Sequence, residues 1–134
     1  MAYRCAFLDD YQNVALKLAD YSKISKDVEF TTYTEPVRRS DADTIRDCKD
    51  FDIVVMMRER TRFPRAVIEA LPKLKLLITT GAYNASIDMK ACAEKGIVVC
   101  GTGGFGNPTT GIAFGLYPAR QAARKSPIEA LRYE

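Results

Sequence analysis

Apolar and polar residues change their spacing repeatedly along this chain, as in proteins that alternate strands with helices. Five short runs of apolar or β-branched residues predict strands, and stretches with helical spacing of apolar residues separate them. The predicted strands are residues 4–8, 28–34, 53–57, 74–79 and 97–100. The predicted helices are residues 14–22, a segment that begins after Ser40, residues 64–71 and residues 88–95.

Signals at the ends of these elements support the assignment. Ser40 is followed three residues later by Asp43, a pair that predicts a capping-box-like helix start. Gly96 stands directly after the last predicted helix, where glycine commonly ends helices. The unbroken apolar run at residues 53–57 predicts a strand covered on both faces. We therefore expect a flavodoxin-like, doubly wound α/β fold whose five-stranded parallel sheet has the order 2-1-3-4-5.

Composition narrows the possible functions. The chain has 134 residues, with 20 basic and 17 acidic side chains mixed along most of the sequence, which argues against a nucleic-acid partner. No apolar run approaches the about eighteen residues of a membrane span, and the four cysteines lack metal-ligand spacing, so we expect a reduced cytoplasmic protein with no metal site. The chain contains no histidine, which excludes Ser-His-Asp and Cys-His catalysis by this chain alone.

Doubly wound sheets bind their ligands beyond the carboxyl ends of the strands. The positions at this edge are Asp9, Asp10, residues 58–61, residues 80–84 and residues 100–107. Any binding chemistry is therefore expected among these residues.

One candidate is a phosphoacceptor receiver domain, which shares the predicted strand order. Such a domain needs acids after the first strand, an aspartate after the third, a hydroxyl after the fourth and a lysine after the fifth. Asp9 and Asp10 meet the first requirement and Thr79–Thr80 the third. Met57–Arg58 and Cys100–Gly101 stand where the aspartate and the lysine belong. The receiver is thus a remote alternative, and a turn with a helix cap explains Asp9 and Asp10 better.

A carboxylate-binding edge is the second candidate. Arg58 follows a buried strand, and a guanidinium can hold a carboxylate through two parallel hydrogen bonds. The backbone of Thr80, Gly81 and Ala82 can approach an anion closely because Gly81 has no side chain. The alternative is structural: Arg58 pairs with Glu59 or Asp10, and Gly81 only supplies a positive φ.

A G-x-G-x-x-G motif at Gly101–Gly106 follows the last predicted strand, and Asn107–Pro108 follows the motif. In isolation this is the dinucleotide-binding fingerprint. The fingerprint belongs on the first strand of its unit, with a ribose-binding acid about 20 residues later. Only Glu129 and Glu134 remain as acids after it, so we predict no nucleotide site here.

Two longer segments carry a family resemblance. Met57–Pro64 (MRERTRFP) and Leu71–Asp88 (LPKLKLLITTGAYNASID) resemble the N-terminal substrate domain of NAD-dependent D-isomer-specific 2-hydroxyacid dehydrogenases, most of all the phosphoglycerate dehydrogenase-like branch. Phe7–Gln12 (FLDDYQ) and Gly96–Gly104 extend the resemblance, which covers about residues 4–117.

The resemblance implies roles for individual residues. Arg58 and the backbone of Thr80–Ala82 would face the carboxylate of a small 2-hydroxy or 2-oxo acid, and Asn84 would shape that loop. Gly101–Asn107 would be the crossover into a second domain, and Thr109 would lie near the nicotinamide.

The resemblance also implies a division into a substrate domain at residues 1–106 and a crossover helix with a basic tail at residues 107–134. Gly111 and Pro118 depart from the family pattern. The family's nucleotide fingerprint and its catalytic Arg, Glu and His lie in sequence that this chain does not have. We therefore expect a truncated protein with no catalytic residue of its own, which binds no NAD and transfers no hydride by itself.

A non-enzymatic role as a small-acid-binding or oligomerisation module is the main alternative. Apolar residues in the predicted arm would otherwise have nothing to cover them, so we expect a homodimer through residues 108–125. These apolar residues are Ile112, Phe114, Leu116 and Tyr117.

Overall fold

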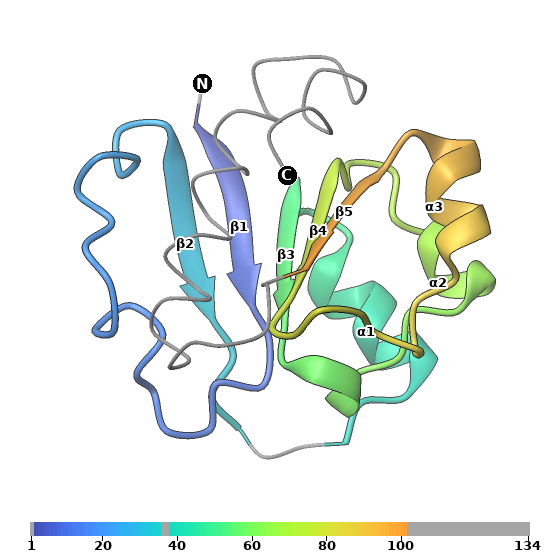
Figure 1. The fold of residues 1–134 in the computed structure, drawn as a ribbon, viewed down its shortest axis with the longest axis horizontal. Helices are drawn as coiled ribbons and strands as arrows, with labels where there is room; N and C mark the ends of the chain where they lie inside the picture. Colours follow the sequence, from blue (N-terminus) through green and yellow to red (C-terminus); the bar gives the residue numbers. More distant parts are fainter. Residues whose placement is uncertain (1, 36–37, 102–134) are drawn as a thin grey trace.

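The computed structural model describes residues 2–35 and 38–101 (Figure 1). These residues form one five-stranded sheet in which all paired strands are parallel. The strands are β1 (Tyr3–Phe7), β2 (Val28–Thr32), β3 (Ile53–Met56), β4 (Leu76–Thr79) and β5 (Val98–Gly101). Their order is β2-β1-β3-β4-β5, so the predicted topology is confirmed.

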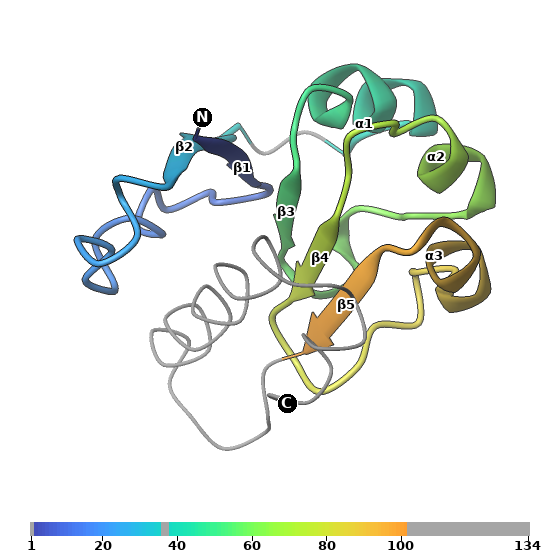
Figure 2. The same cartoon turned by 90° about the horizontal axis from the view of Figure 1, so that it is seen from above.

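Helices α1 (Asp41–Cys48), α2 (Arg65–Glu69) and α3 (Met89–Lys95) lie on one face of this sheet, whereas the connection between β1 and β2 lies on the other (Figure 2). The handedness of parallel connections explains this division. The chain moves across the sheet in one direction from β2 to β5, and right-handed crossovers then place every helix on the same side. The step from β1 to β2 runs the opposite way, and its connection covers the opposite face.

The prediction of a helix at residues 14–22 is wrong, because the backbone there forms isolated turns and no continuous ladder of helical hydrogen bonds. The carboxylate of Asp10 accepts the backbone N–H groups of Val14 and Ala15, both at 3.0 Å. The Tyr21 hydroxyl donates to the Ala15 carbonyl at 2.8 Å, and a continuing helix would need that carbonyl for its own ladder. Side chains thus take backbone groups that the helix requires.

The helix ends follow the sequence signals. Ser40 accepts from the Asp43 N–H while Asp43 accepts from the Ser40 N–H, so the predicted capping box is confirmed. Gly96 ends α3 in the left-handed conformation, with φ 71°. The loop expected at residues 58–61 instead contains a short 3₁₀ turn, η1 (Arg58–Arg60).

Both faces of the sheet carry buried apolar clusters, as the unbroken apolar run of β3 predicted. All four cysteines, Cys5, Cys48, Cys92 and Cys100, are buried. Within residues 2–35 and 38–101, no helix has the length and apolar character needed to cross a membrane. The predicted arm at residues 107–134, and with it the boundary after residue 106, lies outside the described residues.

Candidate functional site

The carboxyl ends of β1, β3 and β4 meet at one edge of the sheet, and hydrogen bonds join the segments that follow them. Arg60 donates to the Asp9 carbonyl at 3.4 Å, which links the β3 and β1 ends. The Arg58 N–H donates to the Thr80 hydroxyl at 3.3 Å, which links the β3 and β4 ends. The sequence-predicted edge residues are therefore neighbours in space.

Arg58 has an unusual backbone and an exposed side chain. Its φ of 47° lies in the left-handed region, which non-glycine residues seldom adopt and which costs about 1–3 kcal/mol. Among the residues that the structure describes, its guanidinium makes no hydrogen bond and no ion pair, so the expected alternatives of pairing with Glu59 or Asp10 are not observed. Strain of this kind concentrates at functional sites.

Asn84 holds the Arg58 backbone in place. Its side-chain amide is buried and donates to the Arg58 carbonyl at 2.6 Å and to the Thr79 hydroxyl at 3.1 Å. Its carbonyl oxygen accepts from the Ser86 N–H at 2.8 Å. One buried side chain thus satisfies groups from the β3 and β4 ends, and it fixes their relative position.

The loop after β4 is shaped by glycine at two positions. Gly81 has φ 143°, which side chains rarely tolerate. Gly101, at the end of β5, lies so near this loop that a Cβ there would be 2.7 Å from both the Gly81 and Ala82 carbonyl oxygens. The first glycine of the G-x-G-x-x-G motif is therefore needed for contact with a neighbouring loop.

Thr80 and Ala82 differ in what they offer a ligand. The Thr80 N–H already donates to the Met56 carbonyl at 3.1 Å, and its hydroxyl donates to the Met57 sulfur at 3.3 Å. In the described part of the chain the Ala82 N–H has no hydrogen-bond acceptor, and Ala82 is exposed. Thr80 therefore positions the loop, and Ala82 presents a donor.

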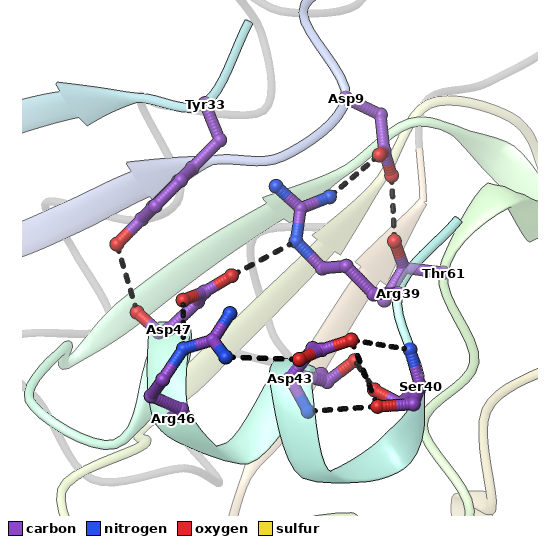
Figure 3. Close-up of polar contacts among 9 residues, drawn as sticks. Asp9, Tyr33, Arg39, Ser40, Asp43, Arg46, Asp47 and Thr61 are labelled. Atoms are coloured by element: carbon purple, nitrogen blue, oxygen red, sulfur yellow. Dashed lines mark hydrogen bonds and ion pairs between the residues drawn. The ribbon is translucent and has the colours of Figure 1, made fainter. Parts of the chain in front are cut away.

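Asp9 belongs to a buried ionic network (Figure 3). Its carboxylate accepts from Arg39 and from the Thr61 hydroxyl, both at 2.6 Å. Arg39 also contacts Asp47 at 3.3 Å and stacks 5.3 Å from the centre of the Tyr33 ring. The Asp9 and Arg39 side chains are 1% and 5% exposed. The residue pattern gave no sign of this pairing, because thirty positions separate the two residues.

The two aspartates are therefore structural. Asp9 is paired with Arg39, and Asp10 accepts the Val14 and Ala15 N–H groups. Residues 2–35 and 38–101 contain no group of three or more acidic or thiol side chains that could hold a metal ion. The turn expected at Asp9–Asp10 is thus present, but Asp10 caps no helix, because residues 14–22 form isolated turns.

A cavity of about 480 Å³ opens between this edge and the connection from β1 to β2. Phe7 and Leu18 contribute apolar walls, and Met57 and Thr80 line its side toward Arg58. Arg60 lines it too, with its guanidinium 4.6 Å from the centre of the Tyr11 ring.

Three of the buried cysteines have thiols that are unreactive at neutral pH. Burial raises the pKa of the Cys48 thiol to about 12 and that of Cys92 to about 11, and burial also raises the pKa of Cys5. All three are protonated at neutral pH, and only a thiolate is reactive.

The arrangement of strands and of the Arg58 loop can be compared with known proteins. The profile of the family "D-isomer specific 2-hydroxyacid dehydrogenase, catalytic domain" matches residues 5–110. This chain belongs to that family. A protein of Haemophilus influenzae named as a 2-hydroxyacid dehydrogenase is 36% identical over 78 residues, which are 58% of this chain and 24% of that protein.

Solved structures of this family have the same fold. A protein of Ralstonia solanacearum named as a D-3-phosphoglycerate dehydrogenase has a TM-score of 0.68 and 35% identity, over 77% of this chain and 31% of its own. A phosphoglycerate oxidoreductase of Vibrio cholerae has a TM-score of 0.66 and 29% identity, over 89% of this chain and 34% of its own. The chain thus spans about a quarter to a third of the relatives that it matches.

Two further matches concern a structure with bound NAD⁺ and a short stretch of this chain. A 3-phosphoglycerate dehydrogenase of Entamoeba histolytica, solved with bound NAD⁺, shares the fold at 23% identity and a TM-score of 0.58. A macrolide export ATP-binding/permease protein of Rhodopirellula baltica is 69% identical over 26 residues, 19% of this chain and 4% of that protein. Thr109, expected near the nicotinamide, lies outside the described residues.

Proposed function

We propose that this chain binds the carboxylate of a small 2-hydroxy or 2-oxo acid at the edge formed by Arg58 and the Gly81–Ala82 loop. The observation that carries the proposal is the exposed Arg58 guanidinium, held on a strained backbone by the buried Asn84 and without an ionic partner in the described residues. Arg58 supplies two parallel donors, Ala82 supplies its N–H, and Thr80 and Asn84 position both.

We infer further that the chain alone performs only the binding part of a dehydrogenase reaction. Hydride transfer requires a held nicotinamide and an acid/base in one closed cleft. The chain has no histidine, and Gly101 is explained by its contact with the Gly81–Ala82 loop. NAD is therefore a cofactor of the family that this chain does not bind by itself.

Calorimetric titration with pyruvate and D-lactate tests the acid site. Replacing Arg58 with Met removes a charge-assisted pair and is expected to weaken binding about 10- to 100-fold. The matched control is Arg62→Met, because Arg62 lies in the same segment but pairs with Asp41 on the surface. Equal affinity of wild type and Arg58→Met would contradict the proposal. Stabilisation of the wild type by NADH would contradict the second inference.

A further inference from the structure

The cavity at the sheet edge lies where the strand order reverses. β1 and β3 are neighbours, yet their following connections run to opposite faces of the sheet. Such a switch point leaves a crevice at the carboxyl ends of the two strands, the usual ligand position in this architecture. The volume of about 480 Å³ falls within the range of small-molecule sites.

The lining of this cavity is mostly hydrocarbon. Phe7, Leu18, Val55 and Met57 line it from three different segments of the chain. Its two carboxylates already have partners, since Asp9 pairs with Arg39 and Asp10 accepts backbone N–H groups. An apolar group can therefore enter without leaving these charges unpaired.

The cavity is lined by residues next to those of the proposed acid site. Met57 and Thr80 line the cavity, and they are the neighbours of Arg58 and Gly81 in the chain. An acid whose carboxylate meets Arg58 can direct its substituent past Met57 into this space.

Arg60 is the one cation that lines the cavity among the described residues, and it is already engaged. Its guanidinium stacks on Tyr11 and donates to the Asp9 carbonyl. This arrangement favours a hydrocarbon over a phosphate as the occupant.

We propose that this cavity receives the hydrocarbon substituent of the bound acid, so that the chain selects 2-oxo or 2-hydroxy acids with an apolar tail over phosphorylated ones. This inference rests on the proposed function, because the carboxylate must first bind at Arg58.

A homologous series of straight-chain 2-oxo acids, from pyruvate to 2-oxohexanoate, tests the proposal by calorimetry on the full chain. Each buried methylene is expected to lower Kd about fourfold. The same measurement is made with a phosphorylated acid and its unphosphorylated counterpart. We expect 3-phospho-D-glycerate to bind no more tightly than D-glycerate.

Leu18→Trp narrows the cavity and is expected to weaken the dependence on tail length while pyruvate still binds as in the wild type. Leu16→Trp is the matched control, because Leu16 lies in the same segment, is 43% exposed and does not line the cavity. Val14→Trp narrows the same space from another position, and thermal unfolding checks that each variant is folded.

The outcomes separate this inference from the proposed function. A Kd that does not change with tail length in the wild type, or tighter binding of the phosphorylated acid, would overturn the cavity assignment and leave the Arg58 site intact. Failure of every acid to bind the wild type would overturn both.

Discussion

Replacing Asp9 with Asn tests how much its buried ion pair with Arg39 stabilises the fold. Asp9 lies in the left-handed region with φ 60°, and its carboxylate is shared between Arg39 and Thr61. The substitution keeps the shape of the side chain and removes its charge. Arg39, 5% exposed, would then have to keep its charge with Asp47 alone.

The expected loss of stability follows from the burial of this ion pair. Removing one partner of a buried ion pair typically destabilises a protein by about 3–5 kcal/mol. Arg39 keeps its contacts with Asp47 and the Tyr33 ring in this variant. We therefore expect Asp9→Asn to lower the free energy of unfolding by about 3 kcal/mol, the smallest value in this range. With an m-value of about 2 kcal/mol per molar, the urea midpoint falls by about 1.5 M.

Urea unfolding followed by circular dichroism measures this change. Asp50→Asn is the matched control, because among the described residues its carboxylate makes only an exposed 4.0 Å pair with Lys73. Loss of this pair is expected to change stability by less than about 0.5 kcal/mol. Adding Arg39→Met to Asp9→Asn should recover part of the loss, since no unpaired charge stays buried. A cost below about 1 kcal/mol for Asp9→Asn would refute the reasoning.

Two further predictions concern the first helix and the C-terminal segment. Ser40→Ala removes the capping box of α1 and is expected to cost about 1 kcal/mol in chemical unfolding at neutral pH. Hydrogen bonds from Ser40 hold the pKa of Asp43 below its usual value, so this stabilisation is present above the unfolded pKa of about 4 and is lost as pH falls through the lower folded value. The gap between the stability curves of wild type and Ser40→Ala should therefore narrow in acid, while the bond from the Asp43 N–H to the Ser40 hydroxyl keeps part of it, and a constant gap would contradict the assignment. Replacing both Arg120 and Arg124 with Met should leave the Kd for pyruvate within about twofold of the wild type, and a larger loss would place the segment in the acid site.

The sheet could be predicted from sequence because its signals are local. Apolar runs, Ser40 and Gly96 mark where elements begin and end, and the handedness of the connections then restricts the order of the strands. The helix prediction at residues 14–22 is wrong because side-chain contacts, and not local signals, decide the structure there. Their apolar spacing is helical, but Asp10 and Tyr21 bind the backbone groups that a helix needs, and spacing does not reveal such competition.

The candidate site also has features that could be predicted from the sequence and features that could not. The sequence located Arg58 and the residue 80–84 loop at one edge, because strand ends can be placed once the topology is known. It did not reveal the left-handed backbone of Arg58 or the internal use of the Thr80 N–H, since both depend on contacts between different strand ends. The Asp9–Arg39 pair was missed for that reason too.

Recognition of a carboxylate by Arg58 and the loop after β4 is the central claim, and nuclear magnetic resonance tests it directly. Pyruvate is titrated into ¹⁵N-labelled protein, with its uncharged amide, pyruvamide, as the comparison ligand. We expect pyruvate, and not pyruvamide, to shift the backbone signals of Gly81 and Ala82 together with the side-chain Nε–H signal of Arg58. Equal shifts with both ligands, or shifts confined to other parts of the chain, would contradict it.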